Sequence, residues 1–317
     1  GRYIASGQGG ENSDAIVWDC ESRTLIYRLA EHDHGVVAVA FSHDDRLLCT
    51  VGALEDKKIL VWDVSNGCIV TIVPHNPSPC MVVAWGGMYR DIKRRDTQDY
   101  QLVTAGDKKI VFWALNPYTG EMAGARIICE SRGSLARDIT AVAFTDDKET
   151  VLCGTSSGDF FPVSVKSQTL GGAVPACRLG ALSLLPLPDG GVMVGGGDGT
   201  LTVFDAKLRD TAQVRLRGGV VALSPGPPSG PGGGEGVAGT DQGFIYRVRT
   251  AGGLMSLEVS ESHCGPVACV GYAPGVSDRF ATASDDGTLR VWDASDYSTL
   301  TTVVVRDAEQ PLCLVLT

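Results

Sequence analysis

The sequence predicts an all-β protein built from seven similar units, and three observations lead to this prediction. First, an aromatic or apolar residue recurs at the end of a strand-like run, at Trp18, Trp62, Trp113, Val163, Phe204, Val248 and Trp292. Second, successive markers lie 41 to 51 residues apart, a period typical of repeat architectures. Third, each unit divides into four short apolar or alternating runs separated by turn residues, which indicates antiparallel strands. Seven four-stranded units predict a seven-bladed β-propeller of 28 strands over residues 1–317.

The last complete unit shows the four predicted strands most clearly. They are Pro266–Tyr272, Arg279–Ser284, Thr288–Asp293 and Ser298–Val305, and Asp286-Gly287 forms a tight turn between the second and the third. The first blade is expected to be split between the ends of the chain. Its predicted strands are Tyr3–Gly7, Ala15–Asp19 and Thr24–Ala30, with Leu312–Leu316 as the missing first strand. Pairing the termini in this way would remove two open sheet edges.

Composition excludes several classes of function. The chain has 317 residues with 44% hydrophobic side chains and a net charge of -10, so it lacks the basic face that nucleic-acid binding requires. Its longest apolar runs are far shorter than the roughly 20 residues needed to cross a bilayer, so no membrane partner is expected. The ten cysteines form no CxxC pair, which predicts no metal, no cofactor and a reducing, intracellular setting.

Trp-Asp at the end of the third strand resembles the WD40 repeat family. The motif stands at Trp18-Asp19, Trp62-Asp63 and Trp292-Asp293, and Phe204-Asp205 is a near match. In that family a His, a Ser or Thr, an Asp and the Trp form a hydrogen-bonded tetrad. The resemblance implies two such structural tetrads, His263, Thr282, Asp286 and Trp292, and His32, Thr50, Asp56 and Trp62. The fourth and sixth units lack Trp and His, so apolar packing alone is expected to hold their blades.

Motifs that could indicate an enzyme have simpler interpretations. Gly154 to Gly158 matches the G-x-S-x-G nucleophile elbow, but Ser156 lies where other units have a strand-to-strand turn. The five histidines would be spread around the ring rather than converge on one site. Runs such as Gly195 to Gly199 are predicted to be turns, because no helix follows that could hold a phosphate. We therefore expect no catalytic residues and no small-molecule substrate, while a hydrolase acting through Ser156 remains an alternative.

The remaining signals are surface loops that could bind a partner protein. Residues 86–100 lengthen the third unit, and this predicted loop carries Tyr89, Arg90, Lys93, Arg94 and Arg95 as a candidate basic contact for an acidic partner. The loop 116–124 is expected on the same face. On the opposite face, two acidic loops carry the candidate contact residues Glu11, Asn12, Asp14 and Glu55. Residues 224–234 form a Pro- and Gly-rich insertion. Ordinary solvated loops remain the alternative for each of these segments.

Several segments together resemble the cilia- and flagella-associated protein 52 family. They are Tyr3 to Gln8, Ala15 to Asp19, Leu216 to Val220, and the degenerate third strands at 160–163 and 244–248. The resemblance implies the N-terminal half of a two-propeller protein that binds the luminal wall of ciliary doublet microtubules. Its partners would be tubulin and other axonemal proteins, and it would be found in the cilium or flagellum with a cytoplasmic pool. The alternative is a general cytosolic WD-repeat adaptor, although Glu21, Ser65 and Ser295 replace the Arg that one class of ubiquitin-ligase receptor has after Trp-Asp.

Overall fold

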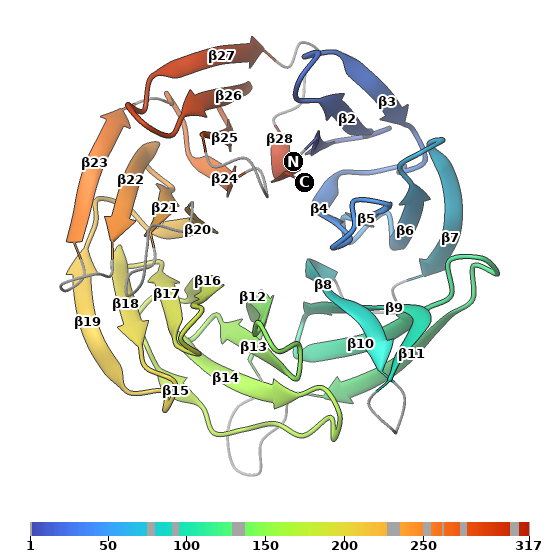
Figure 1. The fold of residues 1–317 in the computed structure, drawn as a ribbon, viewed down its shortest axis with the longest axis horizontal. Coiled ribbons are helices and arrows are strands. Elements are labelled where there is room, and N and C mark those ends of the chain that lie inside the picture. The colour runs from blue at the N-terminus through green and yellow to red at the C-terminus, as the bar shows by residue number, and fades with distance from the viewer. Residues whose placement is uncertain are drawn as a thin grey trace.

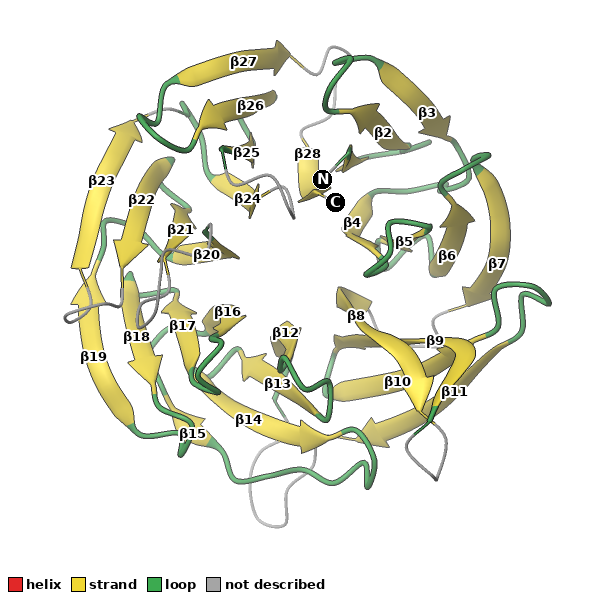
Figure 2. Cartoon of the chain, in the orientation of Figure 1, coloured by secondary structure: helices red, strands yellow, loops and turns green. Residues whose placement is uncertain are grey.

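Seven four-stranded antiparallel sheets surround a central axis (Figure 1). The computed structural model describes residues 2–74, 80–90, 95–128, 137–226, 235–249, 255–261, 263–272, 278–304 and 311–316. Within these residues all regular structure is strand (Figure 2). The predicted fold class, a seven-bladed β-propeller with four antiparallel strands per blade, is confirmed.

Each blade is named below by its strands. The split blade contains β28 (Pro311–Leu316), β1 (Tyr3–Gln8), β2 (Ala15–Asp19) and β3 (Leu25–Leu29). The next two contain β4 (Val36–Phe41), β5 (Leu47–Gly52), β6 (Lys58–Asp63) and β7 (Cys68–Pro74), then β8 (Cys80–Arg90), β9 (Asp96–Gly106), β10 (Lys109–Leu115) and β11 (Met122–Ile128). The fourth and fifth contain β12 (Ile139–Phe144), β13 (Thr150–Thr155), β14 (Asp159–Ser164) and β15 (Val174–Pro175), then β16 (Ala181–Pro186), β17 (Val192–Gly196), β18 (Thr200–Phe204) and β19 (Asp210–Arg215). The last two contain β20 (Val220–Pro225), β21 (Glu235–Thr240), β22 (Phe244–Arg249) and β23 (Met255–Glu261), then β24 (Val267–Tyr272), β25 (Arg279–Ser284), β26 (Thr288–Asp293) and β27 (Thr299–Val304).

The ring closes through the split blade, as the sequence predicts. Strand β28 from the C-terminal end pairs antiparallel with β1, with Ile4 opposite Leu316 and Gly7 opposite Cys313. Both termini therefore lie near the centre of the ring (Figure 1). Strand β28 also contacts β24 and β4, the innermost strands of the two neighbouring blades. Closure thus gives both β1 and the neighbouring blades a partner that an open array would lack.

The core lies between the faces of adjacent blades. One cluster joins Ala5 and Val17 of the split blade to Leu48, Leu60 and Trp62 of the next blade. Because both faces of a middle strand meet a neighbouring sheet, all six residues of β5 are buried. Outermost strands such as β7 have only partly buried and exposed residues. This gradient explains why a second strand such as β5 is largely apolar, whereas an outermost strand such as β19 carries polar and charged residues.

Some turns between second and third strands use glycine at a positive φ, whereas Lys57 and Lys108 take that conformation in others. In the run 195–199, which was predicted to be a turn, Gly195 and Gly196 end strand β17 and the turn follows them. Gly199 has φ of +80°, and a Cβ there would lie 2.6 Å from the carbonyl oxygen of Leu216. Gly158 is similar, with φ of +89°, and a Cβ there would clash with the carbonyl oxygen of Cys177. These glycines allow the tight hairpin turns and the close approach of the connection that leads to the next blade.

The predicted loop over residues 86–100 is largely a hairpin, so that prediction was wrong. Strands β8 and β9 have 11 residues each and stay paired as far as Arg90 opposite Asp96. Register shifts at Gly87 and near Tyr89 let the ladder continue beyond the blade. The paired residues 86–90 and 96–100 are called the arm below. Lys93, Arg94, His75 and residues 227–234 of the insertion lie outside the described residues.

Candidate functional site

A buried hydrogen-bonded tetrad joins the strands of blade β4–β7. His32 precedes β4, and its Nδ1 lies 2.7 Å from Oδ2 of Asp56 in the β5–β6 turn. The other ring nitrogen, Nε2, lies 2.8 Å from the hydroxyl of Thr50, which also accepts a 3.0 Å hydrogen bond from Nε1 of Trp62. Burial outweighs the neighbouring Asp56 carboxylate and lowers the pKa of His32, so the ring is neutral near pH 7.

Blade β24–β27 contains the same tetrad. Nδ1 of His263 lies 3.0 Å from Oδ2 of Asp286, and Nε2 lies 2.7 Å from the Thr282 hydroxyl, which accepts from Nε1 of Trp292 at 2.9 Å. Asp286 also accepts a hydrogen bond from the backbone N–H of Cys264. Burial raises the pKa of Asp286, but the hydrogen bonds outweigh it and lower that pKa to about 2. Burial likewise lowers the pKa of His263.

An Asp, a His and a hydroxyl in a row are the components of a catalytic triad, but these two cannot act as one. A nucleophilic hydroxyl must reach a substrate and be free to lose its proton to the imidazole. Thr50 and Thr282 are both fully buried, and each oxygen already accepts from a tryptophan N–H. The tetrads therefore tie the second strand, the third strand and the preceding connection together, which is a structural role.

Two other tryptophan positions contain only part of this arrangement. In blade β8–β11, Nε1 of Trp113 donates to Thr104 at 2.8 Å. In the split blade, Nε1 of Trp18 is buried and has no hydrogen-bond partner within the part of the chain that the structure describes. Packing alone holds the Trp18 indole among the described residues, and its ring lines the cleft considered further below.

The two degenerate blades differ from each other. In the sixth unit Leu216, Ala238 and Val248 belong to one apolar cluster, although Asp241 in the β21–β22 turn also accepts a hydrogen bond from the backbone N–H of Gly219. In the fourth unit the prediction of apolar packing alone was wrong, because the buried Asp159 pairs with Arg137 and accepts a hydrogen bond from Thr155. This polar cluster connects the segment before β12 to the start of β14. Arg137, Thr155 and Asp159 do not occupy the sequence positions of the tetrad residues, so the tetrad pattern could not predict this cluster.

In blade β16–β19, Cys177 and Asp198 occupy the positions of the tetrad His and Asp, and the sequence pattern did not predict this pair. Cys177 stands four residues before β16, as His32 does before β4, and its thiol donates to the carbonyl oxygen of Gly180 at 3.1 Å. Asp198 takes the turn position and accepts from the backbone N–H of Arg178 and Thr200. Burial raises the pKa of the Cys177 thiol to about 11, so it is not a thiolate near pH 7. Spacing measured from the strands was the signal that could have identified the pair.

Ser156 lies in the hairpin turn between β13 and β14, as expected from its place in the repeat. The chain continues from the turn directly into a strand, so the strand-to-helix geometry of a nucleophile elbow is absent there. Ser156 is exposed, and its backbone N–H donates to the carbonyl oxygen of Asp138. Nothing in this turn activates the hydroxyl.

Three of the five predicted basic-contact residues are described, and they lie on the arm or just beside it. Tyr89 is 42% exposed, and Arg90 pairs with Asp96 at 3.0 Å. Arg95, just before the returning strand β9, is exposed. The β10–β11 turn belongs to the same blade and carries Tyr118, which is 70% exposed. The guanidinium carbon of Arg46 lies over the Tyr118 ring, 5.3 Å from the ring centroid. Arg46, Tyr89, Arg90, Arg95 and Tyr118 are called the arm face below.

The predicted acidic contact residues on the opposite face are not equally available. Glu11 forms an isolated bridge with His34, and Asn12 has φ of +54° and donates its backbone N–H to Asp33. Asp14 is buried, and its carboxylate pairs with Arg28, so the prediction that it is a contact residue was wrong. Glu55 is exposed. Only part of the predicted acidic patch can therefore meet a partner directly.

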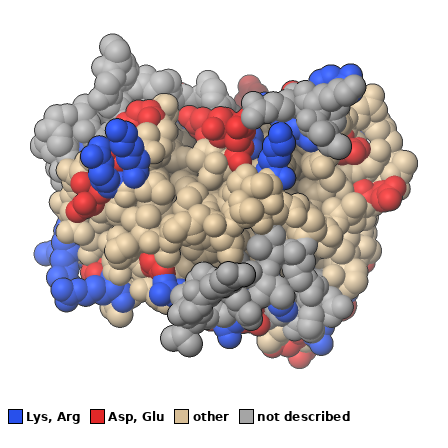
Figure 3. Space-filling model, turned by 90° about the horizontal axis from the view of Figure 1, so that it is seen from below, with Lys and Arg blue, Asp and Glu red and all other residues tan. Residues whose placement is uncertain are grey.

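Charged side chains gather near the two rims of the ring, whereas the outer wall between them is mostly uncharged on the side shown in Figure 3. Among the described residues, no group of three or more His, Cys, Asp or Glu side chains is placed so that it could hold a metal ion. The same residues contain no helix long and apolar enough to cross a membrane.

The fold is a seven-bladed β-propeller, and two of its blades contain a complete tetrad, an arrangement that resembles WD repeats. The family model of the WD domain, G-beta repeat, matches residues 23–63 and 255–293, which include the two complete tetrads' third strands. Among solved structures, a chain in the crystal structure of a mitotic checkpoint complex has a TM-score of 0.75, with 14% identity over 92% of this chain and 83% of that chain. That similarity concerns the fold alone.

The sequence is similar to curated proteins named cilia- and flagella-associated protein 52. The Chlamydomonas reinhardtii protein is 28% identical over 98% of this chain and 49% of its own length. The Homo sapiens protein is 28% identical over 96% of this chain and 48% of its own length. Centriole proteome protein 16 of Chlamydomonas reinhardtii is 26% identical over 91% of this chain and 15% of its own length. The chain thus spans about half the length of the cilia- and flagella-associated relatives.

Proposed function

We propose that this chain is a non-catalytic scaffold that binds the luminal wall of ciliary doublet microtubules and neighbouring inner proteins, and so stabilises the axoneme. The observation that carries the proposal is the similarity to cilia- and flagella-associated proteins over nearly the whole chain. It includes the degenerate blades, which are less generic than Trp-Asp. Tubulin and other axonemal proteins are the proposed partners, and the cilium or flagellum is the proposed location, with a cytoplasmic pool.

The chemistry of the described residues supports a binding role. The buried hydroxyl, imidazole and carboxylate groups of the tetrads are used within the blades, and the burial of Thr50 and Thr282 keeps substrate away from them. What varies from blade to blade is the length and charge of the connections, on a rigid ring. Such a ring can hold several partners at once.

We further propose that the complete protein contains two propellers in succession, of which this chain is one. The relatives are about twice as long as the region matched. A second propeller would give the protein two binding surfaces within one chain, so one molecule could contact more than one neighbour.

The arm face is the proposed contact with the partner. Tyr118 and Tyr89 are large exposed side chains, and aromatic residues and arginines are enriched at the centres of protein interfaces. The neighbouring arginines Arg46, Arg90 and Arg95 favour an acidic or mixed surface.

The experiment uses ciliated cells that lack the endogenous protein and express tagged full-length protein. After the membrane is removed with detergent, the wild-type protein should stay with the axonemes, and doublets from cells without it should be less resistant to salt. Tyr118→Asp should shift protein into the extract, because the change places a carboxylate where an aromatic contact is proposed. Leu179→Asp is the matched control, because Leu179 is 66% exposed and belongs to a connection on the opposite face.

A protein that is spread through the cytosol and absent from extracted axonemes would contradict the proposal and favour the general WD-repeat adaptor. Axonemal protein with equal retention of both variants would retain the scaffold but overturn the arm face as its contact.

A further inference from the structure

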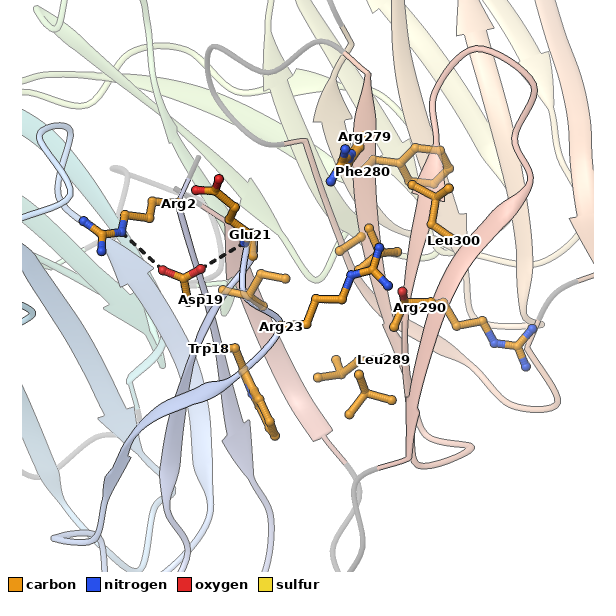
Figure 4. A pocket seen from close by; sticks show the side chains of 16 residues that line it. Arg2, Trp18, Asp19, Glu21, Arg23, Arg279, Phe280, Leu289, Arg290 and Leu300 are labelled. Carbon is orange, nitrogen blue, oxygen red and sulfur yellow. Dashed lines mark hydrogen bonds and ion pairs between the residues drawn. The ribbon is translucent and has the colours of Figure 1, made fainter.

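A cleft of about 520 Å³ lies between the split blade and blade β24–β27 (Figure 4). One wall comes from β1, β2 and the turn after β2, and the other from β25, β26 and β27. Its volume is in the range of pockets that bind a small molecule or a few side chains. The apolar part of its lining includes Ile4, Trp18, Phe280, Leu289, Val291 and Leu300.

The apolar lining extends from the core to the surface. Phe280 and Leu289 are almost fully buried, at 1% and 6% exposure, whereas Leu300 on the outermost strand is 38% exposed. An apolar side chain entering the cleft would thus find buried walls at depth and an apolar edge at the entrance. Burial of one Leu- or Phe-sized side chain contributes roughly 1.5–3 kcal/mol.

Arginines surround this apolar cleft although the chain as a whole is acidic. Nε of Arg2 lies 3.2 Å from Oδ2 of Asp19, and Nε of Arg279 lies 3.8 Å from Oδ1 of Asp278. Both arginines therefore have carboxylate partners. The guanidinium of Arg290 points away from the cleft in Figure 4, toward Asp286 at 3.9 Å. These three arginines are wholly or partly neutralised.

Arg23 differs from the other three. It is exposed in the β2–β3 turn with φ of +58°, and its side chain points into the space between the two blades (Figure 4). No ion pair of its guanidinium occurs among the described residues. Glu21 in the same turn also lines the cleft, so the rim is mixed, with Arg23 as the cation still able to bind an external carboxylate.

We propose that this cleft binds an extended segment of a partner protein in which a Leu or Phe side chain lies next to an Asp or Glu. The apolar side chain would occupy the space between Ile4, Leu289 and Leu300, and the carboxylate would accept hydrogen bonds from Arg23. The apolar walls do not suit a nucleic-acid backbone. A second copy of the chain is disfavoured as the occupant, because two copies of net charge -10 repel each other.

This site is separate from the arm face and does not depend on an axonemal location. The arm belongs to blade β8–β11, whereas the cleft lies between the split blade and blade β24–β27. Figure 1 shows blade β4–β7 between the split blade and blade β8–β11. One ring could therefore bind an anchoring surface through the arm face and a linear segment through the cleft. Failure of either proposal leaves the other intact.

The test measures fluorescence polarisation of labelled peptides of about nine residues with the complete protein. The first peptide has Leu-Phe flanked by Asp and Glu, the second has the same apolar pair flanked by Lys, and the third has the acidic flanks with Ala in place of Leu and Phe. We expect the first to bind at least about tenfold more tightly than either of the others, with weaker binding in higher salt.

Two variants and one control locate the binding. Arg23→Glu should weaken the first peptide about tenfold or more, because it replaces the proposed carboxylate partner with a like charge. Leu300→Glu should weaken it similarly by placing a charge at the apolar entrance. Lys207→Glu is the matched control, because Lys207 is an exposed cation in the corresponding turn of blade β16–β19. The affinity of this variant for the first peptide should change less than about twofold. Thermal melting checks that each variant is folded.

Any of four results would overturn the proposal. These are equal binding of the Lys-flanked peptide, unchanged affinity of folded Arg23→Glu, equal weakening by Lys207→Glu, and no binding of any of the three peptides. A dimer that Leu300→Glu dissociates would identify a second copy as the occupant, and so would also contradict it.

Discussion

Blades β4–β7 and β20–β23 build the same four-stranded sheet with opposite chemistry at equivalent positions. The first ties its strands through a polar tetrad, in which His32, Thr50 and Trp62 are all nearly or fully buried. The second has Leu216, Ala238 and Val248 there, within one apolar cluster. In both blades the strand pairing and the inter-blade core define the sheet, and the tetrad is one of two ways to fill a buried position without leaving a polar group unpaired.

The split blade should show the largest effect, because its innermost strand comes from the other end of the chain. Deleting residues 311–317 removes the partner of β1 and a contact of β4 and β24. We expect a loss of more than about 5 kcal/mol of unfolding free energy, or failure to fold, as for other large core losses. Urea unfolding measures this. An unchanged midpoint would show that β28 does not close the ring.

Truncation compares the two kinds of blade directly. Trp62→Ala should cost about 3–5 kcal/mol, since it removes a large buried aromatic ring and also leaves Thr50 without a donor. Val248→Ala, at the equivalent position, should cost about 2 kcal/mol from its lost methyl groups and the cavity left behind. Both are measured by urea unfolding at constant pH. Equal losses would mean that the tetrad position matters less than the comparison implies.

Exchanging the residue types tests whether each set works only as a whole. His263→Leu leaves Asp286 and Thr282 without the imidazole and should cost about 1–3 kcal/mol. Leu216→His places an imidazole in an apolar cluster and should cost a similar amount. Differential scanning calorimetry should find both variants folded and less stable. A Leu216→His variant that is more stable than the wild-type chain would contradict the view that an incomplete tetrad lowers stability more than an apolar cluster does.

The smallest effect is the pH dependence of the tetrads. Burial lowers the pKa of His32 and His263 below 6.5 in the folded state, so the unfolded chain binds protons first as the pH falls. Stability from both histidines is therefore complete above about pH 6.5 and decreases below it. Asp286, with its pKa lowered to about 2, adds a second decrease below about pH 4.

Melting temperatures between pH 7.5 and 5 should fall slightly for the wild-type chain and less for a folded His263→Leu variant. An equal pH dependence of the two proteins would rule out His263 as a source of it.

The sequence predicted the features that repeat locally, and it missed those that arise between units. Trp-Asp and the Asp286-Gly287 turn mark single hairpins, so strand number and order could be predicted from them. The arm was missed because its pairing continues a ladder already begun inside the blade, without a new strand signal. Asp14 was misassigned because its partner Arg28 lies on another strand. The cleft brings together the two ends of the chain, which no local pattern indicates.

We propose that this ring serves as a binding platform inside ciliary doublets, and electron cryotomography of axonemes tests this proposal most directly. Doublets from cells that express the protein should show a ring-shaped density on the luminal wall. That density should be missing in cells without the protein and restored when the full-length protein is expressed again. Doublets with identical luminal density in all three cell lines would contradict the account.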